Sequence, residues 1–167
     1  MTDLNAARMT ARLDGDFVVF LIGMRINAPW KVWKWGPVAA AMPRMLIELA
    51  QQPELGLLHA RTFFGFPNIM VLQYWRSFEH LHAYATDNTR AHLPAWRAFN
   101  RAVGTNGDVG IWHETFLVKD GQHESVYANM PRWGLAWAGD LVPAEGRKRT
   151  AKGRLGLTNA TDDAANH

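Results

Sequence analysis

Cysteine is absent from the 167-residue sequence. This absence excludes a disulfide framework, a thiolate nucleophile and a thiolate-bound metal. No apolar run reaches the roughly 18 residues that a membrane-spanning helix needs, and the first residues lack the basic segment and apolar run of a signal peptide. We therefore expect a cytoplasmic protein that does not cross a membrane.

Familiar catalytic motifs are also missing: the sequence has no Gly-rich phosphate loop, no G-x-S-x-G and no H-E-x-x-H. The net charge of +3 arises mainly from a basic run near the C-terminus, formed by Arg147, Lys148, Arg149, Lys152 and Arg154. The rest of the chain is close to neutral, so we expect no nucleic-acid binding by the folded domain. Residues 143–167 are expected to form a basic, disordered tail.

The remaining sequence predicts one α+β domain over residues 15–142, preceded by a frayed segment and ending in a C-terminal arm. Apolar runs rich in branched and aromatic residues predict four strands, at residues 16–25, 55–64, 68–76 and 109–118. Helical periodicity predicts helices from Pro37 to residue 52, from Ser77 to residue 85, and from residues 90–94 to about 103. The order βαββαβ predicts a ferredoxin-like fold with a four-stranded antiparallel sheet.

The first strand is apolar at nearly every position. An antiparallel sheet with helices on one face normally alternates apolar and polar residues, because its other face meets water. Something therefore has to cover the second face. A second copy of the chain is the interpretation that we favour, and the alternative is that the arm at residues 130–142 covers this face.

One predicted helix carries an unusual polar face. His92, Trp96 and Asn100 recur at helical spacing. His92 lies at the start of the helix, where the helix dipole disfavours the imidazolium, and a neutral imidazole can act as a base or a metal ligand. The alternative is a histidine that only caps the helix or binds a neighbouring loop.

Alternation along the last strand places His113 and Glu114 on opposite faces of the sheet. His113 is a second candidate for a base in a pocket. Glu114 needs a partner in an apolar sheet, which is either a ligand or an arginine such as Arg25 or Arg76. Tyr74, in the third strand, is placed to hydrogen-bond a ligand or to complete a polar network.

Six segments together resemble a bacterial and fungal family of monooxygenase-like proteins in the dimeric α/β-barrel superfamily, which includes a fumagillin-pathway monooxygenase. These segments are residues 17–27, 42–46, 73–79, 92–100, 107–115 and 129–131. The resemblance implies two ferredoxin-like protomers whose sheets face each other, and a pocket between sheet and helices in each. Related antibiotic-biosynthesis monooxygenases act without metal or flavin, and other relatives, including aldoxime dehydratases and haem-degrading monooxygenases, bind haem.

The sequence and the resemblance lead to one main hypothesis and two alternatives. The main hypothesis is a cofactor-independent monooxygenase for a small hydrophobic or aromatic substrate, with His92 or His113 as the catalytic base and no metal. We expect the substrate to be bound by Tyr74, Trp96, Asn100, Arg25 and Glu114. The alternatives are a haem enzyme with His92 or His113 as axial ligand, and a homodimer that binds a ligand without catalysis.

Overall fold

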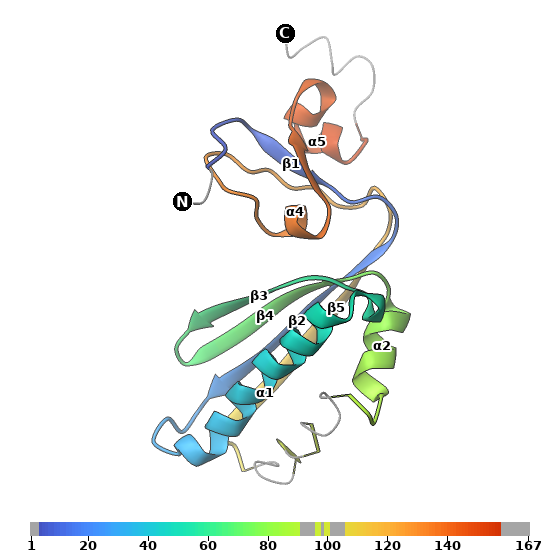
Figure 1. Ribbon diagram of the computed structural model, residues 1–167. Helices are drawn as coiled ribbons and strands as arrows, with labels where there is room; N and C mark the ends of the chain where they lie inside the picture. Colours follow the sequence, from blue (N-terminus) through green and yellow to red (C-terminus); the bar gives the residue numbers. More distant parts are fainter. Residues whose placement is uncertain (1–3, 91–95, 98, 101–105, 158–167) are drawn as a thin grey trace. The chain divides into compact units, whose positions relative to one another are not determined.

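A computed structural model describes residues 4–90, 96–97, 99–100 and 106–157 (Figure 1). The chain divides into two compact units. We call residues 18–117 the central unit, and residues 1–17 together with 118–167 the terminal unit. In the parts of the chain that the structure describes, no helix is both long and apolar enough to cross a bilayer.

A four-stranded sheet with the strand order β3-β4-β2-β5 forms the central unit. Its strands are β2 (Phe17–Ile26), β3 (Leu57–Gly65), β4 (Asn68–Trp75) and β5 (Val109–Val118). β4 runs antiparallel to both β2 and β3. The helices are α1 (Val32–Gln51) and α2 (Phe78–Thr86), with a single 3₁₀ turn, η1 (Pro53–Leu55), after α1. This order and topology confirm the predicted ferredoxin-like α+β fold.

α1 begins at Val32, before the predicted start at Pro37. Pro37 and Pro43 both lie inside this helix, although a proline lacks the N–H that an interior helical position donates. Tertiary packing outweighs this loss, because Trp35 packs against the buried cluster of Met24, Ile26 and Val109. Its indole N–H also donates to the Pro29 carbonyl at 3.0 Å. The helix boundary therefore follows packing rather than local propensity.

Trp75 is the centre of the main core, at 1% exposure. It packs with Val18, Leu49 and Leu81, and its indole N–H donates to Oε1 of Gln73 at 2.8 Å. The buried polar atom is thereby satisfied, as a well-ordered core requires.

Tyr84 belongs to the same core, and its hydroxyl donates to Oε2 of Glu48 at 2.8 Å. Burial, and then this hydrogen bond, raise the pKa of the Tyr84 phenol above its ordinary value. The phenol therefore stays protonated at neutral pH and joins α2 to α1.

The direction of α1 follows from the two core clusters. Trp35 and Val38, near its start, pack against Met24 and Ile26 at the end of β2. Met45 and Leu49, near its other end, pack with Val18 at the beginning of β2. The helix therefore runs opposite to β2, along the face of the sheet that also meets α2 (Figure 1).

The other face of the sheet, here called the second sheet face, carries the alternate residues of each strand. A Cβ on Gly23 would lie 2.6 Å from the Trp112 indole, so only glycine leaves room for this ring. Pairing of β2 and β3 with β4 places the apolar residues Val19, Leu21, Phe63, Met70 and Leu72 on this face, together with Arg61. Alternation along β5 places Phe116 on the same face as Trp112. The apolar character predicted from the first strand is thus present on both sides of the sheet.

In the terminal unit, β1 (Met9–Arg12) pairs antiparallel with β6 (Asp140–Pro143). Met9 and Tyr127 also exchange backbone hydrogen bonds of 2.8 Å. The helical segments are α4 (Leu135–Ala138), η2 (Gly146–Arg149) and α5 (Ala151–Arg154). The expected fraying before residue 15 is therefore not found at β1, because this segment gains a complete strand partner from the far end of the chain.

We expected disorder from residue 143 onward. The structure instead contains η2 and α5 in this part of the chain, which it describes as far as residue 157. The Arg154 guanidinium is almost fully buried and donates to Oε2 of Glu124 at 2.8 Å. It donates as well to the carbonyl oxygens of Lys148 and Arg149. One residue of the basic run thus fixes η2 and α5, and residues 158–167 lie outside the described part.

Candidate functional site

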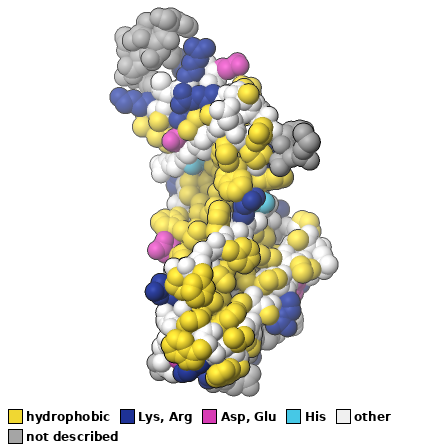
Figure 2. Space-filling model, turned by 90° about the vertical axis from the view of Figure 1, so that its left-hand side faces the viewer, with side chains coloured by type: hydrophobic (Ala, Val, Ile, Leu, Met, Phe, Trp, Pro, Cys, Tyr) yellow, Lys and Arg dark blue, Asp and Glu magenta, His cyan; other side chains and the backbone are white. Residues whose placement is uncertain are grey.

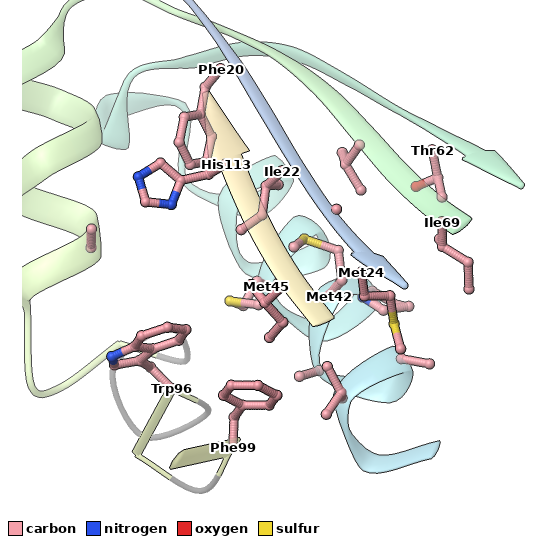
Figure 3. Close-up of a pocket in the computed structure, with 18 of the residues that line it drawn as sticks. Phe20, Ile22, Met24, Met42, Met45, Thr62, Ile69, Trp96, Phe99 and His113 are labelled. Atoms are coloured by element: carbon pink, nitrogen blue, oxygen red, sulfur yellow. The ribbon is translucent and has the colours of Figure 1, made fainter. Parts of the chain in front are cut away.

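A cavity of about 640 Å³ lies in the central unit between the sheet, α1, α2 and the segment around Trp96 (Figure 3). Its walls are mostly apolar. β2 contributes Phe20, Ile22 and Met24, which are alternate residues and therefore share one face of the strand. A cavity of this size and character fits a small organic molecule.

His113 brings a titratable group into this apolar wall. It lies on β5 between Ile111 and Thr115, which also line the cavity. Its ring is 5.6 Å from the ring of Phe20, centroid to centroid (Figure 3). Among the described residues, no hydrogen bond to the His113 ring nitrogens is found, so an imidazole nitrogen is available to a bound molecule.

α1 forms the wall opposite the sheet. Lys34, Val38, Ala41 and Met45 all line the cavity, and their spacing of i, i+4, i+7 and i+11 places them on one helical stripe. Met42 lies beside this stripe. Unbranched methionine side chains adapt to ligands of irregular shape.

Trp96 and Phe99 close the cavity across from His113 (Figure 3). Their rings stack, with centroids 5.6 Å apart and planes inclined by 21°. Trp96 is 43% exposed, so its indole stands at the rim of the cavity. Such a pair presents aromatic surface to a substrate.

The ionisable side chains in the lining are Lys34, Arg44, His82 and His113, and among the described residues no acidic side chain lines the cavity. The sequence contains no aspartate or glutamate between Asn88 and Gly107, which includes the segment on either side of Trp96. The described ionisable side chains of the lining are therefore all basic in type.

Of the predicted site residues that the structure describes, His113 and Trp96 line this cavity. His92 lies outside the described residues. Asn100 is exposed and is not among the described residues that line the cavity.

Tyr74, Arg25 and Glu114 lie on the second sheet face, away from the cavity. The pairing explains this placement, because Tyr74 is opposite Val19 while its neighbour Gln73 faces the helices. Arg25 donates instead to the side chains of Asn27 and Asn68. Within the described ranges, Glu114 forms no ion pair, so the expected bridge to Arg25 or Arg76 is not found. None of these three residues lines this cavity, and their role in binding a substrate remains a prediction.

Several lining residues were not predicted as site residues, among them Lys34, Met42, Met45 and His82. The sequence offered one usable indication, the alternation of Phe20, Ile22 and Met24. A strand with a large apolar residue at every second position has to bury that face against either a core or a ligand.

No group of three or more metal-ligating side chains is present among the described residues. Haem, considered above because relatives bind it, needs an axial imidazole and cations for its propionates. His113 could supply the imidazole, and Lys34 and Arg44 the cations, so the residues of the cavity fit this group. When bound, haem would supply a redox-active iron beside the apolar wall.

Residues 17–135 match the monooxygenase af470-like family. The chain belongs to this family. A curated relative, monooxygenase af470 of Aspergillus fumigatus, is 29% identical over 151 residues, which cover 77% of this chain and 53% of the relative. The chain thus spans about half the length of the curated relative it matches. The resemblance noted in the sequence is confirmed.

Two solved structures are similar to this chain. An aldoxime dehydratase, determined in complex with butyraldoxime, has a TM-score of 0.61 and 13% identity, covering 80% of this chain and 39% of its own. SnoaB of Streptomyces nogalater, a cofactor-independent oxygenase, has a TM-score of 0.45 and 13% identity, covering 63% of this chain and 95% of its own. The likeness to the aldoxime dehydratase supports the fold alone.

Proposed function

We propose that the chain is a monooxygenase that oxidises a small apolar or aromatic substrate in this cavity without metal or flavin. The observation that carries the proposal is the imidazole of His113, set in an apolar wall beside Phe20. Membership of a family named for a monooxygenase supports the reaction class. The substrate needs a C–H bond acidified by an adjacent aromatic ring or carbonyl group.

The proposed reaction begins when His113 accepts a proton from a substrate CH₂ group. The resulting carbanion passes one electron to O₂, and the two radicals combine to give a peroxide. After protonation, the hydroperoxide loses water and leaves a ketone. In total, CH₂ and O₂ become C=O and H₂O, so the substrate supplies all four electrons and one oxygen atom remains in the product.

The apolar lining of the cavity assists both substrate binding and the reaction of the carbanion. Trp96 and Phe99 hold an aromatic substrate against the sheet, and Met42 and Met45 adapt to its outline. Excluding water also protects a carbanion from reprotonation before O₂ reacts. The protein thus positions the substrate and moves one proton, while the substrate itself reduces oxygen.

Labelled oxygen tests the proposal directly. Protein freed of metal and flavin is incubated with ¹⁸O₂ and candidate substrates that contain an acidic CH₂ group, and the products are analysed by mass spectrometry. We expect one ¹⁸O atom in the product and the other in water. Binding of these substrates without O₂ consumption would favour the non-catalytic alternative, and activity that requires added haemin would favour the haem alternative.

We further propose that two copies pair through their second sheet faces. This face carries apolar side chains that include Leu72, Trp112 and Phe116, of which Phe116 is 50% exposed. Figure 2, which shows one side of the molecule, likewise shows hydrophobic side chains over much of the visible surface. Soluble monomers seldom leave large apolar patches uncovered.

The replacement Phe116→Glu is expected to convert the dimer into a monomer, because two carboxylates would be buried in the interface without partners. Light scattering after gel filtration measures the mass of wild-type and variant. Thr115→Glu, on the cavity side of the same strand, serves as the control and should remain dimeric. A monomeric wild-type protein would instead favour coverage of this face within one chain.

A further inference from the structure

We propose that one end of the central unit docks on the surface of an anionic lipid bilayer. This end combines the residues around the start of α1 with the tip of the β3–β4 hairpin. We call it the aromatic end and define it by five exposed apolar side chains, those of Trp30, Val32, Trp33, Phe64 and Phe66. The inference goes beyond the proposed function, because docking on a bilayer requires no turnover in the cavity.

A backbone hydrogen bond joins the two parts of the aromatic end. At the end of β2, the Ile26 N–H donates to the carbonyl oxygen of Pro67, in the hairpin turn, at 2.9 Å. Trp30 follows Ile26 closely in the sequence and lies just before α1. Figure 1 accordingly shows the hairpin turn and the start of α1 at the same end of the sheet. The five side chains therefore lie at one end of a single compact unit.

The exposure of this end indicates that it contacts a partner. All five side chains are more than half exposed, and Phe64 is 82% exposed. Single exposed apolar residues are ordinary, whereas a group of them marks an interaction site. Phe64 is opposite Ile69 in the hairpin, on the cavity side of the sheet. Pairing of two copies through their second sheet faces would therefore leave it exposed.

The residue types favour a lipid surface as this partner. Tryptophan is enriched at the membrane–water interface, because its ring is apolar while its indole N–H can reach the polar head groups. Helices that bind membrane surfaces place Trp and Phe toward the lipid, with Lys or Arg beside them. The run Trp30, Lys31, Val32 and Trp33 has this composition. An aromatic end of this kind suits shallow insertion among lipid head groups.

The sequence around the aromatic end contains little negative charge. Residues 17–47 and 55–78 have no aspartate or glutamate. Asp108, whose backbone carbonyl accepts from the Ala28 N–H, lies at the same end of the sheet. Its carboxylate is paired with the Lys31 ammonium at 2.8 Å. Because this pair is neutral in sum, it does not repel an anionic head group.

Arg25 adds a positive charge beside the hairpin turn. It is an exposed residue near the end of β2, and its guanidinium donates to the side-chain oxygens of Asn27 and Asn68. Both amide groups are neutral, and among the described residues Arg25 forms no ion pair. Anionic lipids attract such a charge when it lies close to the membrane surface. The charge of this end therefore complements an anionic bilayer.

The aromatic end also borders the cavity, since Phe64 belongs to both. A bilayer dissolves apolar molecules of the class that the proposed function requires. Docking would thus bring the cavity close to a store of such molecules. This last consequence rests on the proposed function, whereas the docking itself does not.

Sedimentation with lipid vesicles tests the proposal on the full chain. One set of vesicles contains phosphatidylcholine alone, and the other contains about one third phosphatidylserine, which supplies the anionic surface. We expect the protein to sediment with the anionic vesicles and to bind neutral vesicles more weakly. Added salt should reduce binding to the anionic vesicles, because it screens the attraction between exposed charges.

Replacements at the aromatic end should weaken binding. The double replacement Trp33→Ser and Phe66→Ser removes one ring from each part of this end, and we expect a loss of at least about tenfold in affinity for anionic vesicles. Arg25→Gln should lower this affinity by about fivefold and leave binding to neutral vesicles unchanged. Circular dichroism and light scattering check that each variant keeps the fold and mass of the wild-type protein.

Ile47→Ser is the matched control, since Ile47 is an exposed apolar residue of the same helix. The helix rises about 1.5 Å per residue, which places Ile47 roughly 21 Å from Trp33 along α1, and its replacement should leave binding unchanged. Equal weakening by Ile47→Ser and the double replacement would overturn the assignment to the aromatic end.

Absence of binding to anionic vesicles would overturn the proposal itself. Wild-type complexes larger than a dimer that form without vesicles, and that the double replacement disperses, would instead assign the aromatic end to contacts between proteins. Because vesicle binding needs no substrate, its result is independent of ¹⁸O incorporation. Either proposal can therefore fail while the other holds.

Discussion

His113→Gln is expected to lower the rate of substrate-dependent oxygen consumption by about 10²- to 10⁴-fold, the usual contribution of a positioned general base. Glutamine preserves much of the size of histidine but cannot accept the proton. His113 is exposed to the cavity and makes its ring contact with Phe20, so the variant should fold normally. An oxygen electrode measures the rate, and circular dichroism measures the melting temperature.

His123→Gln is the control for this replacement. Its ring packs edge-on against Phe17 at 5.2 Å in the terminal unit, and it should retain full activity. Full activity of His113→Gln with loss of activity in His92→Gln would transfer the role to His92. A folded variant that carries both replacements and remains fully active would exclude both of these histidines as the base.

Trp75→Ala is expected to reduce the free energy of unfolding by about 3–5 kcal/mol, as for other buried tryptophans. Trp75 is 1% exposed, and its removal leaves a cavity among Val18, Leu49 and Leu81. The replacement also leaves Oε1 of Gln73 without the indole N–H that it accepts. Urea denaturation followed by circular dichroism measures the change.

Trp33→Ala provides a matched comparison, since Trp33 is a tryptophan of α1 that is 68% exposed. Exposed side chains contribute little to stability, and the change should stay within about 0.5 kcal/mol. Equal destabilisation by the two replacements would contradict the difference in burial between Trp75 and Trp33. It would instead indicate that Trp33 is buried in solution, for example against a partner.

Much of the fold could be predicted because local patterns and tertiary packing agree. The limits of β5, residues 109–118, were predicted without error, and Ser77 caps α2 as expected by accepting from the His80 N–H. Disagreement arose where distant contacts decide the local structure. The start of α1 depends on packing of Trp35 onto β2 and β5, and β1 depends on a partner strand more than 120 residues away.

The candidate site was harder to predict than the fold. Alternation correctly placed His113 and Glu114 on opposite faces of the sheet, because this prediction requires the position of only one strand. Deciding which face of β4 carries Tyr74 requires the pairing with β2, which the sequence does not specify. Lys34 was missed for a related reason, since a helix predicted to begin at Pro37 has no stripe that extends back to residue 34.

The pairing of β1 with β6 has a consequence for the order of events during synthesis. Met9 leaves the ribosome early, yet its strand partner Pro143 emerges only after the whole central unit. The central unit is one continuous segment and can fold as soon as residue 117 is free, as domains generally do during translation. β1 keeps an unpaired edge until residue 143 has also emerged, and strands with unpaired edges are prone to aggregate. During synthesis, β1 is therefore the segment most exposed to aggregation.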